Sequence, residues 1–142
     1  MAVIDCENDD NSEQNKTPVI DIPTKVSPTA VCITKNYGTV CIAKNKEIKT
    51  FSINGLFLKS AVIDDCDKIT YMISCPFSGI DSIAISGKNK VYVIDSVLLN
   101  VMKIFSVCEN DDEIIDLSSS FADETIICFT KYGKLSIFPL SV

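Results

Sequence analysis

The stretch Thr50-Phe51-Ser52-Ile53-Asn54-Gly55-Leu56-Phe57-Leu58 consists of two apolar-rich runs joined by the pair Asn54-Gly55. An Asn-Gly pair tolerates positive φ angles and is the strongest short signal for a tight β-hairpin. We therefore predict that one strand ends at Ile53, that Asn54-Gly55 forms the turn, and that the next strand begins at Leu56.

The same kind of segment returns twice, at Val91–Ser96 and at Leu135–Leu140. Alignment of Ile53, Ile94 and Phe138 gives steps of 41 residues (from 53 to 94) and 44 residues (from 94 to 138). A period of ~40–45 residues with four strands per unit is typical of β-propeller blades. The predicted fold is all-β: a partial, WD-repeat-like propeller of about three four-stranded antiparallel blades. We expect residues 18–142 to form it, with blades at about 29–63, 69–106 and 113–142, and only three strands in the last.

Several predicted strands are apolar on both faces, for example Val40-Cys41-Ile42-Ala43 and Ile126-Ile127-Cys128-Phe129. A sheet wetted on one side would show simple alternation of apolar and polar residues. Blades that stack face to face bury both faces of their inner strands, so continuous apolar runs favour a propeller.

Composition limits the classes of partner. The chain has 142 residues, 46% of them hydrophobic, and a net charge of −6. This length and apolar content predict one globular domain, and the negative charge argues against a nucleic-acid partner and against general attraction to anionic lipid. No run approaches the ~18 apolar residues of a membrane span, and the start Met1-Ala2-Val3-Ile4-Asp5 lacks the features of a signal peptide. We expect a cytoplasmic chain with no direct membrane insertion.

The amino-terminal segment differs from the rest. Residues 1–17 are mostly polar and acidic, and we predict a disordered tail there. Val19-Ile20-Asp21-Ile22 alternates between two prolines and could form only a short or edge strand. It is the one spare strand that could complete the last blade.

Cysteine usage predicts buried, reduced thiols. The chain has seven cysteines, no C-x-x-C pair and no histidine, so a structural zinc site is not indicated. Small buried hydrophobes are the favoured interpretation and a metal or redox role is the alternative. We expect Cys6 and Cys66 to react with a thiol reagent before Cys41 and Cys128.

The sequence contains no recognisable catalytic or phosphate-binding motif. Without histidine there is no catalytic Ser-His or Cys-His pair, and no phosphate-binding glycine pattern occurs. The densest carboxylate groups, Asp64-Asp65-Cys66-Asp67 and Asp111-Asp112-Glu113, fall in connections between blades, where we interpret them as solvated loops. Calcium binding or acid–base chemistry there is the alternative. We predict no catalytic, cofactor-binding or metal-binding residues and no cofactor.

From about residue 43 onward the chain resembles the last blades of the WD-repeat propeller at the carboxyl end of BEACH-domain, neurobeachin-like proteins. The resemblance rests on Phe51-Ser52-Ile53-Asn54-Gly55 followed by Leu58, on Val91-Tyr92-Val93, and on Ile115-Asp116-Leu117-Ser118. The Gly-His and Trp-Asp signatures of WD repeats are absent, and Ile94 stands where a Trp is common.

The resemblance implies a non-enzymatic scaffold that binds other proteins, is linked to vesicle or membrane trafficking, and lies peripheral to endomembranes through its partners. Self-association or contact with the remaining propeller blades is also expected. Two alternatives stay open: a small acidic metal-binding or enzymatic β-domain using Asp64, Asp65 and Asp67, or a truncated gene product without independent function.

Overall fold

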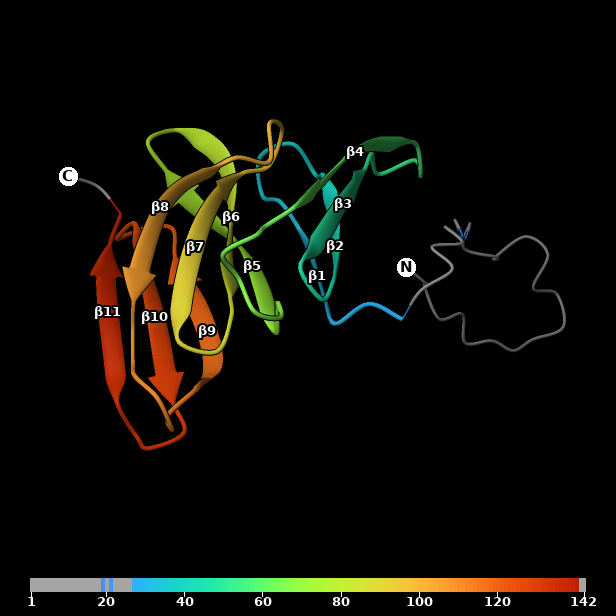
Figure 1. Cartoon of the computed structure of the whole chain (residues 1–142). Helices are drawn as coiled ribbons and strands as arrows, with labels where there is room; N and C mark the ends of the chain where they lie inside the picture. The colour runs from blue at the N-terminus through green and yellow to red at the C-terminus, as the bar shows by residue number, and fades with distance from the viewer. Residues whose placement is uncertain (1–18, 20, 22–26, 141–142) are drawn as a thin grey trace, which may run out of the picture.

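The computed structural model describes residues 19, 21 and 27–140, and the described part is built from eleven strands in three antiparallel sheets (Figure 1). Blade 1 contains β1 (Ala30–Ile33), β2 (Val40–Lys44), β3 (Glu47–Phe51) and β4 (Phe57–Val62). Blade 2 contains β5 (Tyr71–Phe77), β6 (Ile80–Ser86), β7 (Lys90–Asp95) and β8 (Val101–Ser106). Blade 3 contains β9 (Ile114–Ser120), β10 (Thr125–Thr130) and β11 (Leu135–Pro139).

The three sheets stand side by side as an arc. Within each sheet the strands follow chain order, and neighbouring blades meet most closely through their first strands, β1 with β5 and β5 with β9. The outermost strands are β4 in blade 1 and β8 in blade 2, while blade 3 stops at β11. The predicted all-β fold, a partial propeller of three blades with an incomplete last blade, is confirmed.

Two apolar clusters hold the blades together. The cluster between blades 1 and 2 includes Ile48, Ile83 and Ile94, and the cluster between blades 2 and 3 includes Val93 and Ile126. Strands β6 and β7 contribute to both clusters, because their alternating side chains face opposite neighbours. Their continuous apolar sequence follows from burial on both faces.

The hairpin at Asn54-Gly55 differs from the predicted tight turn. Strand β3 ends at Phe51, and Ser52 donates a backbone hydrogen bond to Leu56 O (2.8 Å) while Gly55 N donates to Ser52 O (2.9 Å). Only Gly55 of the central residues has a positive φ, 89°. This is a three-residue loop, Ile53-Asn54-Gly55, in which a type I turn is followed by a left-handed glycine. The predicted strand end at Ile53 was therefore wrong, because this apolar side chain lies in the loop.

The corrected hairpin changes the repeat alignment. Phe51 pairs with Val40 on β2, as Ile94 pairs with Ile83 and Phe138 with Ile126. The repeat steps are thus 43 residues (from 51 to 94) and 44 residues (from 94 to 138). These nearly equal repeat steps are expected when all three blades have the same arrangement of strands.

Some predictions fall outside the described residues. These are the disordered tail at residues 1–17, Cys6, and the alternating strand at 18–23 apart from Val19 and Asp21. In the described part of the chain, no helix is long and apolar enough to span a membrane.

Candidate interaction surface

One end of the arc carries the turns between the second and third strands of each blade together with the connections between blades. We call this the connection face, made of residues 44–46, 63–70, 87–90, 107–113 and 131–134. Ile63 N donates to Lys46 O (2.9 Å) and Ile69 N to Asn45 O (2.7 Å), so the first connection folds back onto the first turn.

The next blade repeats this scheme. Val107 N donates to Asn89 O (2.9 Å) and Ile114 N donates to Lys88 O (2.9 Å). Each connection is thereby held on a turn of its own blade by backbone hydrogen bonds, which do not depend on side-chain identity. The connection face is a fixed platform on which side chains can vary.

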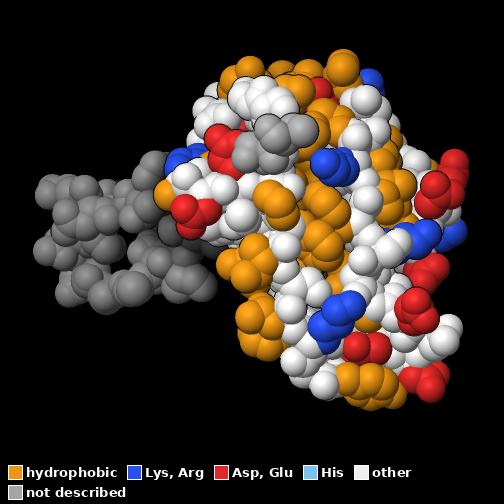
Figure 2. Space-filling model, turned by 90° about the vertical axis from the view of Figure 1, so that its left-hand side faces the viewer, with side chains coloured by type: hydrophobic (Ala, Val, Ile, Leu, Met, Phe, Trp, Pro, Cys, Tyr) orange, Lys and Arg blue, Asp and Glu red, His pale blue; other side chains and the backbone are white. Residues whose placement is uncertain are grey.

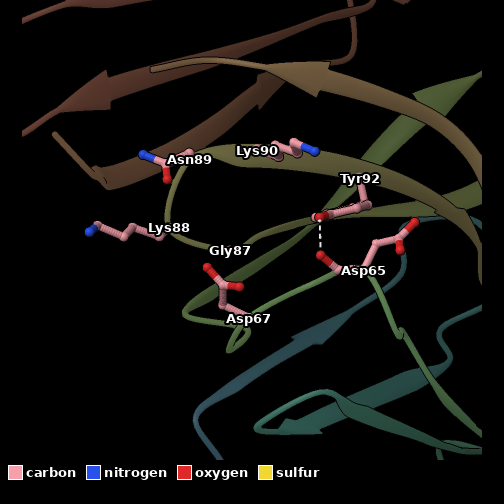
Figure 3. A pocket seen from close by; sticks show the side chains of 7 residues that line it. All are labelled: Asp65, Asp67, Gly87, Lys88, Asn89, Lys90 and Tyr92. Carbon is pink, nitrogen blue, oxygen red and sulfur yellow. Dashed lines mark hydrogen bonds between the residues drawn. The ribbon is translucent and has the colours of Figure 1, made fainter. Parts of the chain in front are cut away.

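A hollow of about 130 Å³ opens on this face, between the first connection and the turn of blade 2 (Figure 3). Its lining residues are Asp65, Asp67, Gly87, Lys88, Asn89, Lys90 and Tyr92. Tyr92 reaches the hollow from β7, and its hydroxyl donates to Asp65 O at 2.9 Å. Burial, aided by Cys66 and the nearby carboxylates, raises the pKa of Tyr92. The tyrosine therefore stays protonated and keeps this donor role.

A second hollow, of about 260 Å³, adjoins the first and shares Asp67, Gly87 and Lys88 with it. It extends to Glu113 at the start of blade 3. A third, of about 380 Å³, lies farther along the same face between Ser106 and the loop of blade 3. The exposed lining carries both signs of charge: Asp65, Asp67, Lys68, Lys88, Lys90, Glu109 and Glu113.

Asp112 is a buried structural carboxylate in this surface. Its Oδ1 accepts hydrogen bonds from Glu113 N (2.9 Å) and Tyr132 N (3.0 Å), which join the second connection to the loop of blade 3. Burial raises the pKa of Asp112, but the hydrogen bonds from Thr130, Tyr132 and Glu113 lower it more, so the net pKa is below its usual value. The predicted solvated loop holds for its exposed neighbours Asp111 and Glu113 and was wrong for Asp112.

The other carboxylate group does not form a site. The side chains of Asp64, Asp65 and Asp67 are exposed. In residues 27–140, no group of three or more His, Cys, Asp or Glu is placed to hold a metal ion. Asp64, Asp65 and Asp67 are therefore not gathered into a metal-holding group within the described residues.

Cys66, within that acidic run, is buried instead of accessible. Burial, followed by the charge of Asp67, raises the pKa of its thiol to about 11. Its Sγ lies where a Cβ added to Gly87 would stand only 3.1 Å away. The prediction that Cys66 reacts early with a thiol reagent was therefore wrong, whereas Cys41 and Cys128 are fully buried as expected.

The opposite end of the arc ties the blades together. Asp81 at the start of β6 is buried and accepts hydrogen bonds from Asn36 N of blade 1 (3.0 Å) and from Ser96 Oγ (2.9 Å). The ammonium group of Lys35 lies 4.3 Å from the ring centre of Phe121, which joins blade 1 to blade 3. The sequence offered no signal for Asp81, because its partners lie in turns far away along the chain.

Comparison with known proteins shows the fold. No protein-family model and no curated protein matches the chain. Among solved structures, BBS1N in complex with ARL6DN is similar to 89% of this chain and 40% of its own, with 16% identity and a TM-score of 0.66. Sqt1 from Saccharomyces cerevisiae is similar to 89% of this chain and 35% of its own, with 16% identity and a TM-score of 0.56.

Both structures are β-propellers, and the chain spans at most two fifths of their length. They do not single out BEACH-domain proteins. The chain is an all-β partial β-propeller.

Proposed function

We propose that this chain is a non-enzymatic protein-interaction scaffold, part of a BEACH-type WD-repeat propeller linked to vesicle or membrane trafficking. The observation that carries the proposal is the connection face: a backbone-held platform with adjoining hollows and charged side chains of both signs. The BEACH assignment and the trafficking role draw support from the sequence string Phe51 to Leu58.

The hollow at Tyr92 suits a side chain of a protein partner better than a small substrate. Sites for small molecules are commonly about 300–1,000 Å³ and mostly apolar. The hollow at Tyr92 is about 130 Å³ and is lined largely by charged and polar residues. Asp67 on one side and Lys88 and Lys90 on the other offer charge pairs to a complementary surface, which favours specific association.

The solved propellers provide a precedent for this use of the fold. BBS1N was crystallised in complex with ARL6DN, a protein partner. The lack of histidine in this chain leaves no Ser-His or Cys-His pair, which supports a binding role over catalysis. We place the protein in the cytoplasm, peripheral to endomembranes through its partners, in keeping with a net charge of −6 that does not favour anionic lipid.

Affinity purification from cytosolic extract tests the proposal. The full chain is used as bait, beside Lys88→Glu at the hollow and Lys59→Glu on the outer strand β4 as a matched charge change at another exposed position. We expect a reproducible partner set that includes trafficking proteins, reduced at least tenfold by Lys88→Glu and unchanged by Lys59→Glu. Recovery of no specific partner, or equal loss with both variants, would count against the scaffold role.

The BEACH assignment has its own test. The genomic sequence preceding the codon for Met1 should contain a reading frame for a BEACH domain, in phase with this chain. An unrelated domain at that place, or a second kind of propeller, would contradict the assignment and leave the binding role of the connection face intact.

A further inference from the structure

Two cysteines of blade 1 lie directly opposite each other on neighbouring strands. Cys32 in β1 and Cys41 in β2 are register partners in an antiparallel pair, and opposite side chains of such a pair project from the same face of the sheet. Cys41 belongs to the apolar cluster between blades 1 and 2, and Cys32 packs against that cluster. The fold therefore brings the two thiols together on the face that blade 1 turns toward blade 2.

The backbone of this pair already has the spacing of a disulfide. Opposite residues of antiparallel strands have Cα atoms about 4.5–5.5 Å apart, and a disulfide joins cysteines whose Cα atoms are about 4.4–6.8 Å apart. The two thiols also interact while they are reduced, because hydrogen bonding with Cys41, followed by burial, raises the pKa of Cys32. Formation of an S–S bond would link groups that are already neighbours.

Among residues 27–140, no other two cysteines are register partners. Cys75 lies opposite Ser82, and Cys128 lies opposite Leu117. The remaining cysteines of this part of the chain are in the connections between blades. A bond between two described cysteines should therefore select the pair in blade 1.

From this juxtaposition we infer that Cys32 and Cys41 are an oxidation site, a pair of thiols that a low-molecular-weight disulfide converts into a reversible cross-strand disulfide. Cys32 is partly exposed and Cys41 is fully buried, so the external disulfide meets Cys32 first. The site is separate from the connection face and does not rest on its proposed binding role.

The reaction proceeds by two thiol–disulfide exchanges. The Cys32 thiolate attacks the external disulfide, whose S–S bond breaks; a mixed disulfide forms on Cys32, and one external thiolate leaves and takes up the proton that Cys32 released. The Cys41 thiolate then attacks the Cys32 sulfur, forms the bond between the two cysteines and expels the second external thiolate, which takes up the Cys41 proton. The protein loses two electrons and two protons, and the external disulfide gains them as two thiols.

Oxidation would fasten the first strand of blade 1. Within the described residues, β1 is an edge strand that is hydrogen-bonded only to β2, and it also contacts β5 of blade 2. A covalent link to β2 keeps β1 in its sheet when hydrogen bonds open, and disulfides in reducing compartments are usually transient. The site is thus a reversible lock on a strand at which two blades meet.

One side of the molecule is suited to association between chains, which the experiment has to separate from a bond within one chain. Figure 2 looks onto the side where β11 lies in Figure 1 and shows a band of hydrophobic side chains broken by a few lysines. Leu135 and Ile137 of β11 are more than half exposed, and no described strand pairs with the outer edge of β11. Exposed apolar faces and open edges promote association, so intact mass is measured without reductant.

Oxidation of the full, folded chain with excess oxidised glutathione tests the inference. After free thiols are blocked, we expect a monomer mass that lacks two hydrogen atoms and a peptide map in which the bond between Cys32 and Cys41 is at least tenfold more abundant than any other. Because attack needs the thiolate and the pKa of Cys32 is raised, the bond should form about tenfold faster at pH 8 than at pH 7. Hydrogen exchange of the β1 amides should slow at least fivefold on oxidation and recover on reduction.

Three variants provide the controls. Cys32→Ser and Cys41→Ala should each abolish the bond and the slowing of exchange. Cys75→Ser is the matched control, because the Cys75 thiol is near enough to raise the pKa of Cys32, and this variant should form the bond as the unmodified chain does. A folded chain that keeps both thiols, a bond that joins either cysteine to another partner, or a bond that forms only in urea would overturn the inference.

Discussion

Blades 2 and 3 contain equivalent strands in different surroundings. Val93 in β7 is fully buried, whereas its counterpart Ile137 in β11 is 59% exposed, although both lie in the third strand of a blade and are β-branched. Among residues 27–140, blade 2 has a neighbouring blade on each face, and blade 3 has a neighbouring blade on one face. Burial in this fold is thus set by the place of a blade in the arc, and sequence pattern shows only that a strand is suited to burial.

The comparison has an energetic consequence. In a repeat architecture each unit is stabilised by its own contacts and by the interface to each neighbour. Within the described residues, blade 2 shares in two such interfaces, while blade 3 shares in one and has three strands instead of four. We therefore expect the arc to open locally from blade 3.

The largest expected difference concerns two isoleucines of equivalent strands. Ile94→Ala removes a fully buried side chain between blades 1 and 2 and should lower the free energy of unfolding by about 2–5 kcal/mol. Ile137→Ala on the exposed face should change it by no more than about 0.5 kcal/mol. Urea denaturation at low protein concentration measures both. Equal losses would show that blade 3 is covered in the isolated chain.

The next largest expected effect is the loss of stability when glycine is replaced in two loops of the same geometry. Gly55 in blade 1 and Gly133 in blade 3 have φ angles of 89° and 90°, and each closes a three-residue loop. Valine at either position should cost about 1–3 kcal/mol through backbone strain, regardless of the blade. Gly38→Ala, at φ 68°, should cost less because alanine is not β-branched.

Thermal melts of these variants test the loop assignment. Tyr132→Val, in the same loop as Gly133 but without a positive φ, is the control and should stay within about 0.5 kcal/mol of the unmodified protein. A Gly55→Val protein as stable as that control would be inconsistent with the left-handed turn.

The positions and order of the strands could be predicted from the sequence, but the burial of particular side chains could not. Continuous runs such as Ile126 to Phe129, separated by turn residues, marked the strands and their order because apolar periodicity is local information. The strand end at Phe51 was missed, since apolar Ile53 in the following loop looks like strand sequence. Burial of Cys66 and Asp112 depends on connections that fold back onto distant turns through backbone hydrogen bonds, and these have no residue signature.

Asp112, which joins the second connection to the loop of blade 3, is expected to make the stability of the protein depend on pH. Its folded pKa lies below the ordinary value of 3.8. Its stabilising contribution is therefore present above pH 3.8 and is lost as the pH falls through the folded pKa. Asp112→Asn should lower stability at neutral pH, and the difference from the unmodified protein should shrink in strong acid.

Asp111→Asn is the control for this experiment, because Asp111 is exposed. Denaturation midpoints from neutral to acidic pH measure both variants. A gap between Asp112→Asn and the unmodified protein that stays constant across this range would show that ionisation of the Asp112 carboxyl contributes nothing to stability.

The smallest expected effect concerns the rate of thiol labelling. This measurement needs no substitution and reports on the opening of each interface between blades. Cys75 and Cys128 lie in the cluster between blades 2 and 3, and Cys41 and Cys66 in the cluster between blades 1 and 2. Burial raises the pKa of Cys75 to about 11 and of Cys128 to about 12, so both thiols are mostly protonated, and therefore slow to react, at pH 8. We expect partly exposed Cys108 to react before the four buried cysteines, then Cys75 and Cys128 together as blade 3 opens, and Cys41 and Cys66 last. Mass spectrometry of quenched samples resolves the order, and Cys108→Ser should remove one fast step without altering the slow ones. Labelling of Cys41 before Cys128 would show that the arc opens from blade 1, which is the reverse of what the exposed face and open edge of blade 3 imply.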